Sequence, residues 1–211
     1  MRDLSCRGIA RRFLGRTGRF SLRERVMGGA AGSLRARLES LARQELTVAV
    51  SDGIYGWTAR YQQIWTHVVV RVQLLPDAAV TNATMETLRA VWRDGIHDTW
   101  SYRWGSGRTG EVVCPFTFEV QWVATDAHQS VRVRQGPARS NMLLWDTDDT
   151  GAVSAHEFGH MLGHRDEYPD ANCPDRSPVD TGSVMDNNSA LVPARMIDPF
   201  ATNIGSSVVE I

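Results

Sequence analysis

HEFGHMLGHRD, at residues 156–166, is the stretch of this sequence that carries the most structural information. It places His156 and His160 four residues apart, so on a helix both imidazoles lie on one face and can direct ring nitrogens at one point. Glu157 follows His156 directly and flanks the same point without having to bind there. This spacing predicts a helix that binds a metal ion and holds a carboxylate beside it.

The residues around this pattern are nearly all apolar, which predicts that the helix is buried. They are Ala152, Val153, Ala155, Phe158, Met161 and Leu162. A polar group buried without a partner is costly, and a metal ion would supply a partner for both imidazoles at once. We therefore predict one catalytic zinc ion (Zn²⁺) held by His156 and His160, with Glu157 taking a proton from a water molecule that the metal activates. The alternative is two core histidines with partners of their own and a chance glutamate.

A catalytic zinc ion usually has three protein ligands, so a third is expected near this helix. Gly163 predicts the helix end, because a glycine tolerates the left-handed backbone that often terminates a helix. The chain can then return Asp166 to the metal. His164 is the rival, since it would join the same face if the helix continued. Two further carboxylates are weaker candidates, Glu167 and Asp170, and a solvated acidic turn is the alternative without a metal.

The sequence resembles the metzincin family of zinc metalloendopeptidases, whose pattern is H-E-x-x-H-x-x-G-x-x-H. The matching positions are His156, Glu157, His160 and Gly163. Asp166 replaces the final histidine of the pattern, as in the snapalysin-like branch, where a tyrosine also follows two residues later, as Tyr168 does here. The resemblance therefore implies that Asp166 is the third ligand. An anionic ligand would lower the net positive charge at the zinc and make its water less acidic.

A second part of the resemblance is the segment GSVMDN at residues 182–187, which is similar to the methionine turn beneath the metal in metzincins. It implies that Met185, like Gly163, shapes the site without reacting. A methionine that fills a gap in the core is the alternative. Several metzincins carry a tyrosine shortly after that methionine. None follows Met185 here, which leaves the role vacant or assigns it to Tyr168 or His164.

The chain as a whole predicts an α/β (α+β), metzincin-like fold, with a twisted mixed five-stranded sheet, an active-site helix and a small irregular C-terminal subdomain. Hydrophobic periodicity predicts the following elements: helices over residues 33–46, 84–100 and 194–201, strands over 65–75 and 111–124, a short hairpin partner over 130–134 and a loop over 105–110. The resemblance implies a substrate-binding edge strand before the active-site helix, which pairs with an extended peptide. Its residues are Asn141, Met142, Leu143, Leu144 and Trp145.

Two segments beside the predicted site have more than one interpretation. Asp146, Asp148 and Asp149 precede Thr150 at the start of the active-site helix, where carboxylates favour the helix N-terminus. A calcium (Ca²⁺) site is the alternative for this acidic loop. Residues 187–200 are mostly small and apolar, and we expect them to form the wall of a specificity pocket that accepts an apolar side chain after the cut.

Charge divides the chain unevenly. Residues 1–45 have a net charge of +7 and the remainder −8. We predict a basic, partly helical N-terminal segment over residues 1–60, which acts as a leader, a transport signal or an appendage, and a catalytic domain over 61–211. The basic segment would contact delivery machinery or an inhibitor. Nucleic acid is not an expected partner, because no aromatic residues alternate with the arginines.

Targeting and redox signals are sparse. No apolar run is long enough to span a membrane, and residues 1–20 lack the apolar core of a classical signal peptide, so export or injection by a non-classical route is one expectation. All 23 basic residues are arginine. Codon bias explains this, or the chain is an effector or toxin delivered into a foreign cytosol, where the absence of lysine removes sites for ubiquitin. The three cysteines leave one unpaired, and a Cys114–Cys173 bridge is one option.

These observations predict a zinc-dependent endopeptidase that acts on a protein or peptide substrate. Two other functions remain open at this point. One is a non-catalytic binding protein that a zinc ion stabilises. The other is a metal hydrolase that acts on a small amide.

Overall fold

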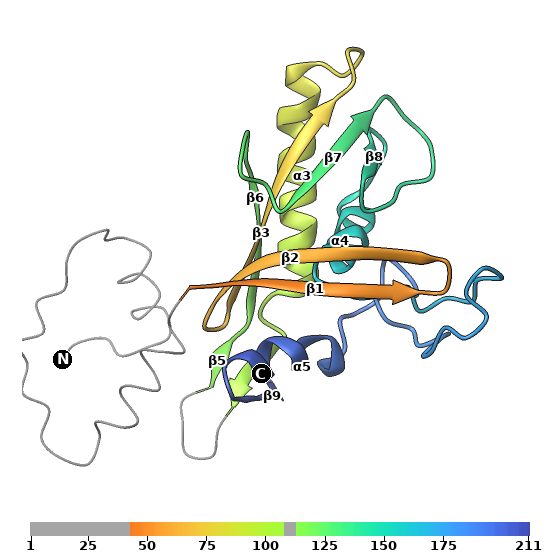
Figure 1. The fold of residues 1–211 in the computed structure, drawn as a ribbon. Coiled ribbons are helices and arrows are strands. Elements are labelled where there is room, and N and C mark those ends of the chain that lie inside the picture. Colours follow the sequence, from red (N-terminus) through yellow and green to blue (C-terminus); the bar gives the residue numbers. More distant parts are fainter. Residues whose placement is uncertain (1–42, 108–112) are drawn as a thin grey trace, which may run out of the picture. The chain divides into compact units, whose positions relative to one another are not determined.

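The computed structural model describes residues 43–107 and 113–211. The described elements follow one another in this order (Figure 1): β1 (Gln44–Asp52), β2 (Tyr55–Ile64), β3 (His67–Pro76), α3 (Asn82–Trp100), β4 (Trp104–Gly107), β5 (Cys114–Pro115), β6 (Thr117–Trp122), β7 (Gln129–Arg134), β8 (Leu144–Asp146), α4 (Gly151–Met161), α5 (Ala194–Asn203) and β9 (Ser207–Glu210). The mixed α/β character predicted from the sequence is confirmed. No helix in this part of the chain is long and apolar enough to cross a membrane.

The helix predicted over residues 33–46 lies mostly outside the described residues, and its end is wrong. Residues 44–46 begin β1 instead. Burial along β1 alternates with a period of two, and the apolar side chains of Leu46, Val48 and Val50 occupy the less exposed positions. That alternation places Leu46 and Val48 against the core. It therefore favours a strand over the predicted helix for these residues.

The main sheet has six strands within the described residues, one more than predicted, and β3 lies at its centre. β1 and β2 form an antiparallel hairpin, and β2 pairs with the start of β3 over residues 67–69. β7 pairs in parallel with the end of β3 over residues 72–76, and β8 continues in parallel beside β7. The sheet is therefore mixed, as expected.

Two predictions about strand pairing are wrong. The segment over residues 130–134, predicted as a hairpin partner, belongs to β7 and does not form a hairpin with the preceding strand, because β6 and β7 both run parallel to β3. The predicted loop over residues 105–110 begins instead as β4, the centre of a separate three-stranded sheet with β5 and β9. The glycines of β4 serve close packing, since a Cβ on Gly107 would lie 2.5 Å from a methyl carbon of Val209.

The compact unit that contains both sheets begins at Arg43. The boundary predicted between residues 60 and 61 falls inside β2, and both strands of the β1–β2 hairpin belong to this compact unit.

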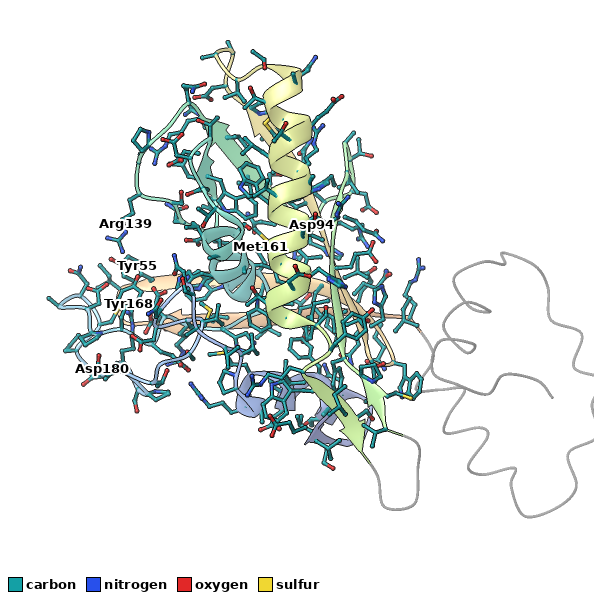
Figure 2. All side chains as sticks on the ribbon, turned by 180° about the vertical axis from the view of Figure 1, so that it is seen from behind. Tyr55, Asp94, Arg139, Met161, Tyr168 and Asp180 are labelled. Carbon is teal, nitrogen blue, oxygen red and sulfur yellow. The ribbon has the colours of Figure 1, made fainter. Side chains whose placement is uncertain are left out.

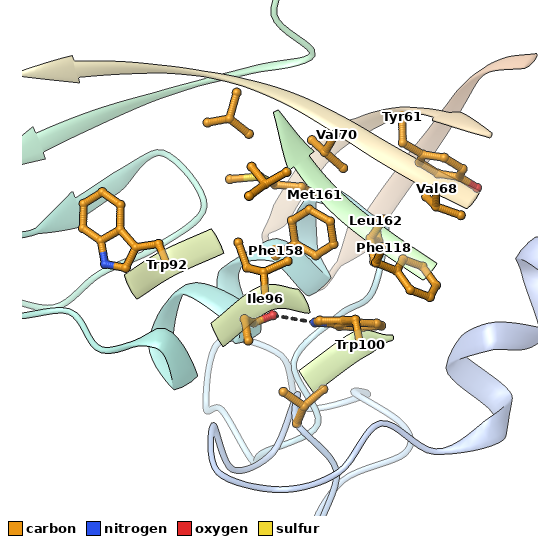
Figure 3. Packing of buried hydrophobic residues seen from close by; sticks show 14 of the residues in the cluster. Tyr61, Val68, Val70, Trp92, Ile96, Trp100, Phe118, Phe158, Met161 and Leu162 are labelled. Carbon is orange, nitrogen blue, oxygen red and sulfur yellow. Dashed lines mark hydrogen bonds between the residues drawn. The ribbon is translucent and has the colours of Figure 1, made fainter. Parts of the chain in front are cut away.

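Helices α3 and α4 pack on the same face of the main sheet, where they enclose an aromatic core (Figures 1 and 3). Trp100 of α3 is fully buried, and its indole nitrogen donates to the Ala155 carbonyl of α4 at 2.9 Å. Trp92 packs edge-on against Trp145 at 4.9 Å between ring centres. This packing fixes α4 against α3, and thereby fixes the direction of the side chains that α4 presents.

Helices α3 and α4 cross at a pair of glycines. A Cβ on Gly95 would lie 2.3 Å from the Gly151 Cα, a separation that backbone atoms cannot tolerate. Replacing Gly95 by alanine should therefore force the helices apart, and we expect a loss of about 1–3 kcal/mol in the free energy of unfolding. Urea denaturation measures it. The exposed Glu86→Ala change on the same helix should alter stability by no more than about 0.5 kcal/mol, and equal effects would contradict the close crossing.

Candidate metal centre

Helix α4 carries His156 and His160, and both of its ends are well defined. Thr150 is its N-cap, and the Thr150 side chain accepts from the Val153 amide at 3.4 Å. The helix ends at Met161, and Gly163 follows with a φ of +99°, in the left-handed region that the sequence predicted. The chain then turns back, which brings the segment after Gly163 alongside the last turns of the helix.

Three side chains converge at this turn. The Asp166 Oδ1 atom lies 3.1 Å from His156 Nε2 and 3.2 Å from His160 Nε2. Donors bound at about 2.0–2.2 Å to a tetrahedral zinc ion lie about 3.3–3.6 Å apart, close to these separations. Among the described residues these three form the one group of side chains arranged to hold a metal ion. The predicted ligands are thus brought together, and their binding of zinc remains a prediction.

Both imidazoles are oriented by backbone carbonyls. His156 Nδ1 lies 2.9 Å from the Val184 carbonyl oxygen, and His160 Nδ1 lies 2.8 Å from that of His164. A carbonyl can only accept, so each Nδ1 carries the proton and each Nε2 is left to bind a metal. This arrangement is the usual outer shell of a histidine-bound metal ion.

The electrostatics of the three groups favour a cation. Burial opposes the anion of Asp166, but the two imidazoles outweigh it and hold the pKa of Asp166 well below its ordinary range. Burial lowers the pKa of His160, yet Asp166 outweighs it and raises that pKa above its ordinary value. A proton therefore tends to occupy the space between His160 and Asp166. A metal ion would displace it, because metal binding requires the neutral imidazole.

Glu157 is buried beside this cluster and does not belong to it. Its Oε2 atom has no hydrogen-bond partner among the described residues. Burial raises the pKa of Glu157 above its ordinary value, although His160 and His156 partly oppose that effect. A buried carboxylate with an unused oxygen is costly unless something else binds it. A water molecule or a substrate group at the metal would do so.

The rival ligands do not reach the cluster. The turn at Gly163 directs His164 into the core, where its ring stacks on Trp100 at 5.4 Å between centres, and burial lowers its pKa to about 4. The Glu167 carboxylate accepts from Thr181, Ser183 and Arg195. That arrangement leaves Asp166 as the third candidate ligand.

The segment around Met185 lies directly below the helix. Met185 is fully buried, and a Cβ on Gly159 of α4 would come 2.3 Å from its sulfur. The Met185 carbonyl accepts from the Glu167 amide at 2.9 Å, and the preceding Val184 carbonyl contacts His156. The turn therefore supports one histidine and the loop of the third ligand at the same time.

Tyr168 lies on the open side of Asp166. Its hydroxyl donates to Asp166 Oδ2 at 3.0 Å, and burial together with that carboxylate raises the pKa of Tyr168 to about 12. Arg139, from the connection between β7 and β8, donates to the Tyr168 oxygen at 3.3 Å, and Figure 2 shows both side chains on the same side of the molecule. Tyr168 thus lies near the cluster, as predicted, whereas His164 does not.

The acidic loop before α4 stabilises itself. The two Asp146 oxygens accept from the amides of Asp148 and Ala138, at 2.8 Å each. Asp149 accepts from the Ser140 hydroxyl and from the Asp146 amide. These carboxylates close the loop, while Thr150 caps the helix, and within the described chain they do not form a metal-binding group. The calcium alternative therefore has no support.

Other predictions near the site are corrected in part. β8 occupies the end of the sheet path but spans only Leu144–Asp146, because Asn141 and Leu144 close a tight turn through mutual backbone hydrogen bonds. Met196, Ile197 and Phe200 face the core, so they cannot form a pocket wall. Cys173 is a free thiol that contacts the Asp52 carbonyl at 3.2 Å, which excludes the Cys114–Cys173 bridge.

The β1–β2 hairpin contributes residues that the sequence did not predict. The Trp57 indole nitrogen donates to the His160 carbonyl at 2.9 Å, and the two rings meet edge-on at 5.5 Å between centres. A Cβ on Gly163 would lie 3.2 Å from a methyl carbon of Val48. No local pattern identifies Trp57, since its partner lies 103 residues away. The alternating apolar residues of β2 predict one face of a strand that includes Trp57, but they do not predict its partner.

Comparison with protein-family models, with curated proteins and with solved structures finds no match to this chain.

The geometry leads to a test of the ligand set. The purified chain should bind one zinc ion, and Asp166→Ala should lose stoichiometric zinc, because the two remaining imidazoles no longer have an anionic third donor. Elemental analysis after dialysis measures the zinc content. His164→Phe, which retains a ring beside Trp100, and Asp170→Asn should bind zinc like the unaltered chain. Loss of zinc in His164→Phe with retention in Asp166→Ala would contradict the assignment.

Proposed function

We propose that the protein is a zinc-dependent endopeptidase of the metzincin type, closest to the snapalysin-like branch with aspartate as third ligand. One observation carries the proposal: a buried glutamate, whose Oε2 atom has no hydrogen-bond partner among the described residues, lies beside three convergent donors, His156, His160 and Asp166. A purely structural zinc site is normally closed by four protein ligands. Three donors and a free carboxylate support a site that does chemistry.

The donor set fits a zinc ion, with neutral imidazole nitrogens and one carboxylate oxygen of suitable mutual spacing. A zinc ion bound there would act as a Lewis acid, which makes a water molecule a nucleophile near neutral pH and polarises the scissile carbonyl. Asp166 contributes through Oδ1, while its Oδ2 is engaged by Tyr168. The hydrogen bond from Tyr168 therefore leaves Oδ1 as the one oxygen of Asp166 that faces the two histidines.

Glu157 has the properties of the proton carrier. Its raised pKa brings it closer to neutrality, where a carboxylate accepts a proton from water and then gives it to the departing amine with the least loss of driving force. Its free Oε2 atom offers the position at which that proton is held. Because the side chain is buried, bulk water does not compete for this role.

A protein or peptide is the proposed substrate. The short edge strand β8 lies just before α4 and offers a backbone edge with which an extended peptide could pair. A small amide would need no such edge and is the second choice. The absence of lysine supports a further proposal, that the enzyme is an effector or toxin that acts in a foreign cytosol.

Replacing Glu157 by glutamine tests the catalytic role. We expect zinc content to stay unchanged and peptide cleavage to fall by at least about 100-fold, because glutamine keeps the shape but cannot carry the proton. Cleavage of a mixed peptide library, followed by mass spectrometry, measures the activity and also reveals specificity.

The exposed Glu86→Gln change provides the matched control and should cleave normally. Undiminished cleavage by Glu157→Gln would refute the general-base role. A zinc-loaded, folded chain that cleaves neither peptides nor small amides would favour a zinc-stabilised binding protein.

A further inference from the structure

A buried ion cluster lies behind the third candidate ligand. The Arg176 side chain is 1% exposed and that of Asp52 is 3% exposed, and Arg176 Nη2 lies 2.7 Å from Asp52 Oδ2. Asp52 ends β1, whereas Arg176 lies in the irregular segment after the metal loop. Charged groups are rarely buried to this extent unless they are paired.

Arg176 is held from several sides. Its Nη1 atom donates to the Tyr168 carbonyl at 2.8 Å, and its guanidinium lies over the Tyr168 ring at 5.1 Å from the ring centre. The hairpin turn is fixed to the same segment, because the Cys173 thiol contacts the Asp52 carbonyl. These contacts confine the guanidinium, although among the described residues Nη1 alone makes a hydrogen bond, and Nη2 interacts with its carboxylate neighbours through charge.

The same guanidinium faces the metal loop. Arg176 Nη2 lies 3.7 Å from Asp166 Oδ2, the oxygen that also accepts from the Tyr168 hydroxyl. The other oxygen, Oδ1, faces the two histidines. A carboxylate without such restraint can rotate and offer one or both oxygens to a metal ion. The neighbours of Asp166 therefore separate its two oxygens. Oδ1 faces the histidines, and Oδ2 faces Tyr168 and Arg176.

We propose that Asp52 and Arg176 form a positioning pair for Asp166, which holds Oδ2 away from the metal so that Oδ1 alone completes the ligand set. Arg176 is a positioning residue, because it acts through Asp166 and does not contact the reacting atoms. Arginine suits this task, since its planar group can meet Asp52, Asp166 and the Tyr168 carbonyl together, whereas a lysine ammonium is a single point. The inference rests on the proposed function only in requiring a metal at this site.

Zinc affinity of the full-length chain tests the inference independently of activity. Arg176→Gln alone would leave Asp52 buried without its cation, so we choose the double change Asp52→Asn/Arg176→Gln, which removes both charges. Outer-shell changes typically weaken metal binding by about 10–100-fold, and we expect a loss in that range by competition with a chelator. The single change Arg176→Lys should weaken zinc binding less than the double change does. It keeps the positive charge beside Asp52 but loses the planar contacts.

Cobalt(II) provides a readout that a merely structural role would not change. We expect the visible spectrum of the cobalt-loaded double variant to differ from that of the unaltered protein, because a released Asp166 can offer its second oxygen and raise the coordination number. Glu45→Gln/Arg71→Gln is the matched control. It removes an ion pair of 3.1 Å that does not contact the metal loop, and it should leave both affinity and spectrum unchanged.

Each outcome decides the inference. A folded double variant with unaltered zinc affinity and cobalt spectrum overturns it and leaves the proposed peptidase standing. If the double variant does not fold, Arg176→Lys decides by the same two measurements. Weakened zinc binding in a chain that cleaves no substrate supports the positioning pair and removes the catalytic proposal. An unaltered protein that binds neither zinc nor cobalt overturns both.

Discussion

The left-handed turn at Gly163 is the constraint on which the candidate site depends. It follows the C-cap Leu162, directs the His164 ring into the core and returns Asp166 to the two histidines. A side chain at this position would adopt a strained backbone and would press on Val48 of the hairpin. Gly163 therefore determines where the helix ends, which side chain can act as the third ligand, and how the hairpin contacts this turn.

Local chemistry explains how much could be predicted from the sequence. The four-residue spacing of His156 and His160 requires only a helix, and the helix end at Gly163 requires only that a glycine be free to adopt positive φ. Both features are short in range, so sequence analysis could find them. The long helix α3 and the central strand β3 were also predicted, because their periodic apolar residues extend over many positions.

The remainder depends on contacts between distant segments. The roles of Trp57 and Arg176 follow from partners far away in the chain, although Trp57 itself lies on the regularly alternating apolar face of β2. The glycines of β4 suggested a loop but allow close packing against β5 and β9. The parallel direction of β7 is likewise a property of the whole sheet, which a pattern within six residues cannot report.

The hairpin has a consequence for the order of assembly. Two of its contacts join residues 103 and 121 positions apart, one with His160 of α4 and one with Cys173. Closing such long loops is entropically costly, and contacts of this kind tend to form slowly. During synthesis the hairpin would leave the ribosome long before α4 exists. A partly made chain would therefore lack the finished cluster of His156, His160 and Asp166 until the segments after α4 have also been released.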